Sequence, residues 1–314
     1  MHTRAQSYRK YLDPNVLRRI GSLELRARLI VEGFFSGMHS SPHRGLSIEF
    51  ADYRPYTQGD DLRHIDWKVF ARTNKYYVKQ YEQETNLNLV LLVDCSESMA
   101  YRSRDDLFTK HEYATSIAAA IAYLALQQQD SVGLATFDEE LTRFIRASSN
   151  PHHWKTIIKE LEGKTGAKKT SVGRVLEQLA ERLPHRTLVI IVSDLFDEVS
   201  VILKGLERLR YRGHEMVVCN VWDPAELALP FSGPTMFEGL EDAGTLLTDP
   251  RSLRERYLEE VERFTGLLRT GCSHMHVDYT VFDTSAPLDV ALSAYLATRS
   301  ARIRQRSSRV LGRG

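Results

Sequence analysis

Short apolar runs alternate with amphipathic stretches through most of the chain after residue 86. Each run has the length of one buried strand, and the stretches between them repeat apolar residues at helical spacing, as Ile117, Ile121 and Leu124 do. This alternation predicts an α/β fold, with a mostly parallel sheet covered by helices on both faces. The predicted strands are Leu87–Val93, Val132–Phe137, Thr187–Val192, Met216–Val221 and Tyr279–Phe282. The predicted helices are Leu107–Gln128, Pro151–Leu161, Val172–Leu183, Val199–Arg210, Ser252–Leu268 and Leu288–Leu296.

A further helix is predicted near the N-terminus. Asp13 and Pro14 are a favourable N-cap and first-turn pair, and Gly33 and Gly37 are expected to end the helix. The apolar residues near one face of this helix are Leu17, Ile20, Ala27, Ile30 and Phe34.

Residues 40–84 combine many aromatic side chains with charges of both signs and show little periodicity. The pattern predicts short strands and turns, with one strand beginning at Lys75. Mixed charges beside aromatic rings suit a polar interface, so we expect this segment to contact a partner or the rest of the chain rather than to catalyse a reaction. The residues assigned to that contact are Arg54, Asp60, Asp61, Arg63, Asp66, Trp67 and Arg72.

The segment 223–249 is too long for an ordinary connection, and two short runs around Glu241-Asp242-Ala243-Gly244 predict an inserted hairpin. We therefore expect an N-terminal helix and small β module over residues 1–85. An α/β domain over residues 86–297 follows, and a basic tail over residues 298–314 is expected to be solvated and disordered.

Two predicted strands end in an aspartate, Asp94 and Asp194, and a third predicted helix is preceded by Thr170. In open α/β sheets, ligands bind beyond the carboxyl ends of the strands where the strand order reverses. Alternate residues of a tight turn point the same way, so Asp94, Ser96 and Ser98 can converge on one ion. Hydroxyl and carboxylate oxygens suit Mg²⁺ or Mn²⁺. Taken singly, each of these residues is as well explained by a helix cap or an Asx-turn.

The combination Asp94-x-Ser96-x-Ser98, Thr170 and Asp194 resembles the metal-ion-dependent adhesion site of von Willebrand factor type A domains. The resemblance implies a doubly wound sheet and an ion that accepts a carboxylate from another protein. It leaves open whether Thr170 or Ser171 is the ligand. Asp94 is then expected to orient ligands or waters, with Ser96 and Ser98 binding the ion directly.

The upstream motifs are similar to those of a bacterial family of unknown function, domain of unknown function number fifty-eight, encoded beside MoxR-type AAA+ ATPases. The matching segments begin at Glu49, Gly59, Ala71 and Lys79. This resemblance implies a non-catalytic adaptor that works with a MoxR-type ATPase in the assembly or maturation of other proteins.

Enzymatic alternatives are less well supported. A Mg²⁺-dependent phosphatase using Asp94 as nucleophile needs a second acid two positions later, where Ser96 stands. The turn lacks the flanking glycines of a serine hydrolase, and Cys95 has no evident histidine partner in the sequence. A zinc site at Cys272, His274 and His276 lacks a second ligand pair at suitable spacing.

The composition of the chain further limits the classes of function and the cellular location to be expected. The chain has 314 residues with 42 basic and 41 acidic side chains, a balance that argues against nucleic-acid binding. Its three cysteines are widely spaced, which is typical of a reducing compartment. We expect a cytoplasmic protein, because the sequence shows neither a signal peptide nor an apolar run long enough to span a membrane.

Overall fold

The computed structural model describes residues 13–39, 53–56, 67–79, 87–163, 170–184, 186–239, 244–288, 292–293 and 295. The chain forms two compact units, one of residues 1–40 and 86–298 and one of residues 41–85 and 299–314. The N-terminal helical segment therefore belongs to the unit that contains the large sheet. The sequence analysis had instead grouped it with the aromatic segment, over residues 1–85.

The larger unit is built on a six-stranded sheet whose strands are β3 Asn88–Asp94, β4 Ser131–Phe137, β5 Leu141–Ser148, β6 Leu188–Ser193, β7 Glu215–Trp222 and β10 Asp278–Asp283. Their order is β10-β7-β6-β3-β4-β5, and every pair is parallel except β4 with β5. The chain builds one half of the sheet outward from β3 and then returns to build the other half from β6. The α/β, doubly wound prediction is confirmed, and the strand order reverses between β3 and β6.

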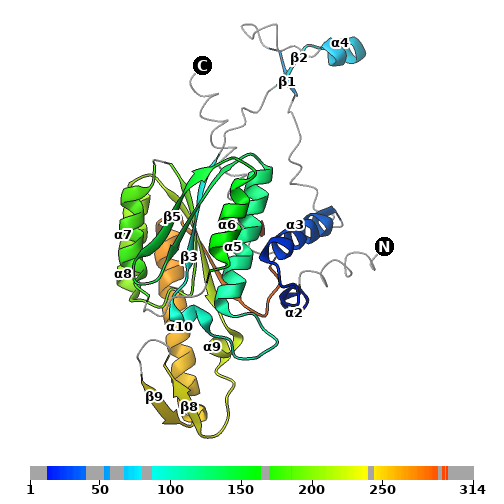
Figure 1. Cartoon of the computed structure of the whole chain (residues 1–314). Helices are drawn as coiled ribbons and strands as arrows, with labels where there is room; N and C mark the ends of the chain where they lie inside the picture. The colour runs from blue at the N-terminus through cyan, green and yellow to red at the C-terminus, as the bar shows by residue number, and fades with distance from the viewer. Residues whose placement is uncertain are drawn as a thin grey trace. The chain divides into compact units, whose positions relative to one another are not determined.

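Helices cover both faces of this sheet. Their bounds are α2 Pro14–Arg18, α3 Leu23–His39, α5 Lys110–Gln127, α6 His153–Leu161, α7 Val172–Arg182, α8 Val199–Tyr211, α9 Pro224–Ala228 and α10 Pro250–His274. Helices α3, α5 and α6 lie on one face, and α7, α8 and α10 lie on the other (Figure 1). Among the residues described, no helix is both long and apolar enough to cross a membrane.

The N-terminal segment differs from the prediction of one helix that Gly33 and Gly37 end. Two helices form, and α3 continues through Gly33 and Gly37 to His39. Burial against α5 offsets the roughly 1 kcal/mol that a glycine costs inside a helix. The Arg26 guanidinium, 8% exposed, donates a hydrogen bond to Ser116 of α5 at 3.0 Å.

The smaller unit contains β1 Tyr53–Pro55, α4 Trp67–Thr73 and β2 Tyr77–Lys79, with β1 and β2 antiparallel. The strand expected from Lys75 is confirmed in part as β2, whereas α4 was not predicted because its apolar residues are too few to show a period. Aromatic rings of this smaller unit pack closely: those of Phe70 and Tyr76 are stacked at a centroid distance of 4.5 Å.

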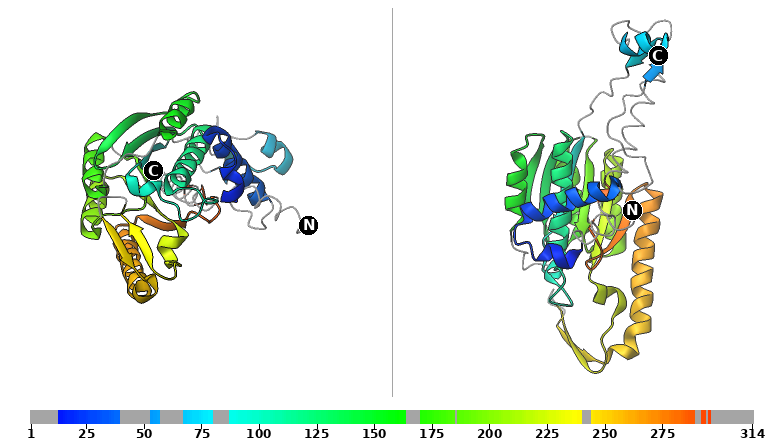
Figure 2. Two further views of the ribbon diagram at one scale, coloured as in Figure 1. Left: turned by 60° about the horizontal axis from the view of Figure 1, so that its bottom comes forward. Right: turned by 90° about the vertical axis from the view of Figure 1, so that its right-hand side faces the viewer.

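The predicted insertion is confirmed as an arm, defined here as residues 223–258. The arm holds α9 and the antiparallel hairpin β8 Thr235–Glu238 and β9 Thr245–Thr248, and it returns along the first turns of α10 (Figures 1 and 2). It leaves the sheet at the carboxyl end of β7. Arg254 fastens it by donating to the carbonyls of Leu229 and Phe231 at 3.0 and 2.8 Å.

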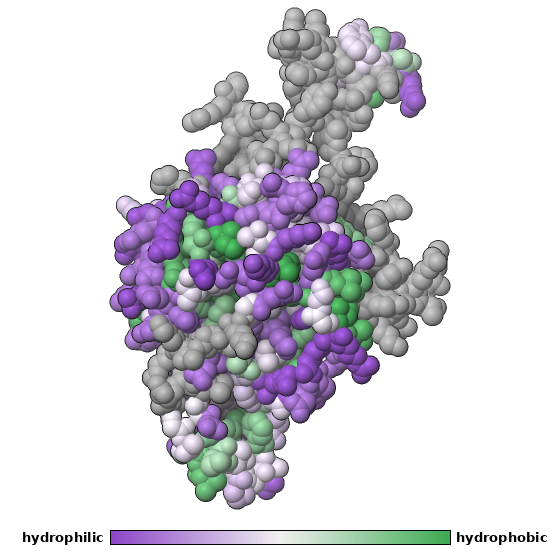
Figure 3. All heavy atoms as spheres, in the orientation of Figure 1, coloured by the Kyte–Doolittle hydropathy of each residue, from purple (hydrophilic) through white to green (hydrophobic). Residues whose placement is uncertain are grey.

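The hairpin of the arm exposes apolar side chains. Met236 and Leu247 face each other across the strands and are 67% and 72% exposed. Apolar surface is visible over the hairpin in Figure 3.

Candidate metal site

The carboxylate of Asp94 lies at the end of β3, in the centre of the sheet. One of its oxygens accepts the Ser96 N–H at 2.9 Å, and the other accepts the Ser193 hydroxyl at 2.5 Å. Asp94 is completely buried. The first bond is the Asx-turn that the sequence allowed, and it fixes the loop that follows.

Ser96 and Ser98 lie side by side in this loop, with their hydroxyl oxygens 3.1 Å apart. Ser96 is 0% and Ser98 8% exposed. Ser96 occupies the N-cap position of the short 3-10 helix Glu97–Ala100, but its side chain makes no capping hydrogen bond. Capping therefore does not explain the Ser96 hydroxyl.

Asp194 follows β6, the strand that pairs with β3. Burial and, to a lesser extent, the nearby carboxylate of Asp194 raise the pKa of Asp94 to about 7, whereas the hydrogen bonds from Ser193 and Ser96 act in the opposite direction. Two buried carboxylates on neighbouring strands that repel each other favour binding of a cation.

Thr170 lies two residues before α7, next to the N-cap residue Ser171, whose N–H donates to the carbonyl of Asp138 at 3.3 Å. Asp138 follows β4, the other neighbour of β3, so the start of α7 is held at the same edge of the sheet as Asp94. The choice between Thr170 and Ser171 as ligand stays open.

The donor set fits a hard divalent cation. Asp94, Ser96 and Ser98 bring oxygen atoms together in one buried turn, and Asp194 adds a carboxylate from the adjacent strand. Oxygen ligands of this kind match Mg²⁺ or Mn²⁺ and suit Zn²⁺ poorly. No cluster of three His, Cys, Asp or Glu side chains suited to a metal occurs within the described parts of the chain. A site here therefore depends on its hydroxyl groups.

The weakly supported zinc alternative is contradicted. Cys272 is buried in α10, whereas His274 is exposed at the end of the same helix and His276 follows in a left-handed conformation at φ 55°. Positions two apart on a helix point in different directions, so these side chains do not converge.

A residue that the sequence analysis missed is Lys110, the first residue of α5. Its ammonium group donates to Asp194 at 2.8 Å and to Glu226 of α9 at 2.7 Å, and its side chain is 2% exposed. The two carboxylates raise the pKa of Lys110 against the opposing effect of burial. One sequence signal was available, because a cation in the first turn of a helix opposes the helix dipole and needs a nearby acid.

The structure also corrects the expectation that Cys95 has no histidine partner. Its sulfur lies 3.7 Å from Nε2 of His111 in α5. Burial raises the pKa of Cys95 to about 12, and the Asp94 carboxylate acts in the same direction. Because burial also lowers the pKa of His111, the pair stays neutral and does not supply a thiolate nucleophile.

The interface residues predicted in the aromatic segment are only partly described. Asp60, Asp61, Arg63 and Asp66 lie outside the described residues. Arg54 lies in β1 opposite Val78, and Arg72 lies in α4 with its side chain exposed. Trp67 is 58% exposed and makes an edge contact with Phe70. The contact role assigned to these residues stays a prediction.

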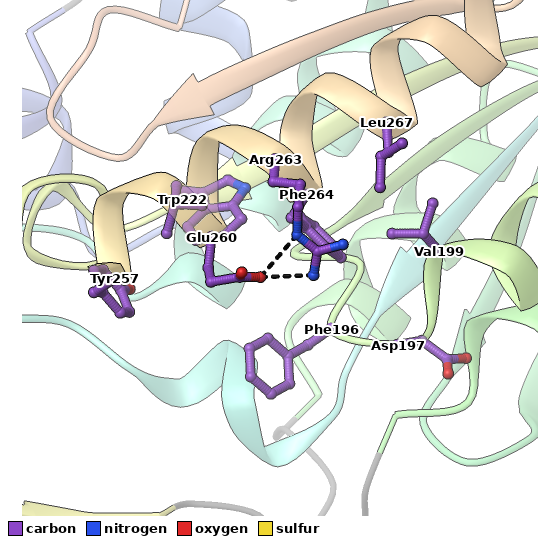
Figure 4. A pocket seen from close by; sticks show the side chains of 10 residues that line it. Phe196, Asp197, Val199, Trp222, Tyr257, Glu260, Arg263, Phe264 and Leu267 are labelled. Carbon is purple, nitrogen blue, oxygen red and sulfur yellow. Dashed lines mark hydrogen bonds and ion pairs between the residues drawn. The ribbon is translucent and has the colours of Figure 1, made fainter. Parts of the chain in front are cut away.

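An apolar cavity of about 380 Å³ is lined in part by Phe196 and Asp197, which follow Asp194 closely in the sequence (Figure 4). Phe196, whose N–H donates to Asp194 at 3.2 Å, lines it with its ring 62% exposed. Glu260 and Arg263 form an ion pair across its lining. The other apolar walls are Val199, Trp222, Tyr257, Val261, Phe264 and Leu267.

Comparison with known proteins gives a match over residues 52–265 to a family described as protein of unknown function DUF58. The uncharacterized protein Mb1516 of Mycobacterium bovis is 25% identical over 232 residues, which are 73% of this chain and 72% of that protein. The uncharacterized protein YeaD of Bacillus subtilis is 30% identical over 123 residues, 39% of this chain and 28% of its own length.

Solved structures with a similar arrangement include BatB from Bacteroides thetaiotaomicron, at 14% identity and a TM-score of 0.43 over 68% of this chain and all of that one. The SpRpn10 VWA domain is 11% identical with a TM-score of 0.38, covering 66% of this chain and 94% of that domain.

Proposed function

We propose that this chain, which belongs to the DUF58 family, is a non-catalytic adaptor that binds an acidic residue of another protein through a divalent cation. The observation that carries the proposal is the buried cluster of Asp94, Ser96 and Ser98 at the end of β3, beside Asp194 at the end of the neighbouring β6, where the strand order reverses. A bound Mg²⁺ or Mn²⁺ would supply a coordination position for a carboxylate oxygen from the partner.

The chain's own residues have distinct roles in this proposal. Ser96 and Ser98 offer neutral oxygens, so a bound ion keeps much of its charge and attracts an acid from outside. Asp94 orients the loop through the Ser96 N–H and is itself oriented by the Ser193 hydroxyl. Asp94 has no exposed surface and both its oxygens are engaged, which disfavours the alternative in which it attacks a phosphate.

The surroundings of the site suit a protein partner. Phe196 and the apolar cavity begin two residues beyond Asp194, and the arm leaves the sheet at the same edge. A partner segment whose carboxylate reaches the cation can therefore place a neighbouring apolar side chain against Phe196. The proposed partner is a MoxR-type AAA+ ATPase, with an assembling protein complex as client.

The test is binding of the purified chain to the MoxR-type ATPase encoded nearest to its gene, measured by biolayer interferometry without nucleotide. Omitting nucleotide keeps the ATPase's own need for Mg²⁺ out of the comparison. We expect the chain to bind the ATPase in the presence of Mg²⁺ and to lose this binding in EDTA. The Asp94→Asn variant should also lose it, and the Phe196→Ser variant should bind more weakly.

The matched control is Glu97→Gln, which removes a charge from the same turn. Glu97 makes no hydrogen bond to the cluster formed by Asp94, Ser96 and Ser98. Binding that persists unchanged in Asp94→Asn would overturn the metal-bridged proposal, whereas loss in both variants would point to a disturbed loop.

A further inference from the structure

The buried Lys110 ammonium is shared between the candidate metal site and the arm. It lies 2.8 Å from Asp194 and 2.7 Å from Glu226, so one cation bridges an acid at the end of β6 and an acid in α9. The side chains of Lys110 and Asp194 are 2% and 3% exposed and that of Glu226 is 25% exposed. Solvent therefore screens the bridge weakly.

Glu226 is fixed in place independently of Lys110. Its second carboxylate oxygen accepts the Asp223 N–H at 2.9 Å in a capping box, and its carbonyl accepts the Tyr257 hydroxyl at 2.7 Å. The Asp223 carboxylate in turn accepts the N–H groups of Ala225 and Ser103. Glu226 is thus a fixed anion that holds the Lys110 ammonium from the side of the arm, while Asp194 holds the same ammonium from the side of the sheet.

The charges do not balance around this bridge. Asp94 and Asp194 are both buried at the ends of the paired strands β3 and β6 and Glu226 adds a third carboxylate, whereas Lys110 brings one positive charge. A divalent cation at the site is attracted by this excess and repelled by the ammonium. Both cations use Asp194, so each weakens the hold of the other.

We propose that Lys110 is a positioning residue that competes with the bound divalent cation for Asp194. Glu226 limits this competition by holding the ammonium toward the arm. The affinity of the site for its cation is therefore controlled by a residue that is not a ligand, because Glu226 of the arm acts on the site through Lys110. This inference rests on the metal-dependent binding proposed above.

The experiment measures Mn²⁺ binding to the full chain from the electron paramagnetic resonance signal of the free ion. The variants are Lys110→Met, Glu226→Gln and the double substitution. We expect Lys110→Met to bind Mn²⁺ at least about tenfold more tightly, and Glu226→Gln about tenfold more weakly. The Glu226→Gln effect should be clearly smaller in the Lys110→Met background, because only the direct attraction between Glu226 and the bound cation then remains.

The control is Asp130→Asn, which removes a buried carboxylate at the amino-terminal end of β4, the end of the sheet opposite to the candidate metal site. Asp130 precedes β4 and accepts hydrogen bonds from Leu87 N–H and the Tyr295 hydroxyl, both at 3.0 Å. The seven residues of β4 separate it from the site by roughly 20 Å. It should lower stability and leave Mn²⁺ affinity unchanged.

Each outcome decides between the two proposals. If the unmodified chain binds Mn²⁺ and neither Lys110→Met nor Glu226→Gln changes the affinity, the role of Lys110 is wrong and the metal site stands. If the unmodified chain does not bind but Lys110→Met does, the competition is supported. If neither binds, both proposals fall. Should Lys110→Met not fold, Glu226→Gln alone decides, and unchanged affinity overturns the inference.

Discussion

Replacing Asp94 by asparagine should stabilise the metal-free protein at neutral and higher pH. The introduced asparagine would keep an oxygen to accept the Ser96 N–H, and its amide group would face the Ser193 hydroxyl oxygen. That oxygen already accepts the Leu195 N–H at 2.9 Å and has capacity for a second donor. The variant therefore keeps the bond from the Ser96 N–H and exchanges the bond donated by Ser193 for one donated to it, while the buried negative charge near Asp194 is removed.

The magnitude follows from the pKa of Asp94, which burial and Asp194 raise from its ordinary 3.8 to about 7. A raised pKa in the folded state means that the folded protein holds this proton more tightly than the unfolded chain does. Its contribution to stability is complete below about pH 4 and is lost as the pH rises to about 7. The difference of about 3 pKa units corresponds to about 4 kcal/mol, the expected upper limit of the gain in Asp94→Asn.

The assay is urea unfolding in EDTA at about pH 5 and about pH 8, for the unmodified chain and the variant. The stability difference in favour of Asp94→Asn should grow between the two pH values. Added Mg²⁺ should stabilise the unmodified chain and leave the variant unchanged, because the site needs the negative charge of Asp94 to hold a divalent cation. A variant that is less stable than the unmodified chain at about pH 8 in EDTA, or a difference independent of pH, would refute this reasoning.

Two further predictions concern packing and thiol chemistry. Gly173→Ala should destabilise the fold by about 1–3 kcal/mol, because the new Cβ would overlap the side chain of Val201. In Gly266→Ala of α10 the new Cβ meets no atom within 4 Å outside its own helix backbone, so stability should rise by about 0.5–1 kcal/mol. Equal effects of the two substitutions in urea unfolding would contradict this. Cys95 should react with iodoacetamide far more slowly than a free thiol at about pH 8, because burial raises its pKa to about 12. The rate is measured by mass spectrometry, and a rate equal to that of the same cysteine in the unfolded chain would contradict the prediction.

Much of the sheet was predictable because parallel strands buried on both faces must be apolar throughout. The five apolar runs correspond to β3, β4, β6, β7 and β10, and the motifs predicted the family that the comparison confirms. β5 escaped prediction because an antiparallel edge strand is half exposed, so its sequence, with Arg143 and Arg146, carries no apolar run. The long α3 was shortened in the prediction because burial, not local preference, carries the helix past its glycines.

By itself, the sequence determined that Asp94, Ser96, Ser98 and Asp194 follow the carboxyl ends of two buried strands, whereas the pairing of these strands as neighbours came from the tertiary structure. Only the tertiary structure decided what surrounds them. The Lys110 ammonium reaches Asp194 because α5 packs beside β6, and Glu226 reaches the ammonium because α9 begins directly beyond the carboxyl end of β7. Contacts between residues 84 or 116 positions apart leave no periodic trace in a sequence, since they depend on how whole elements pack.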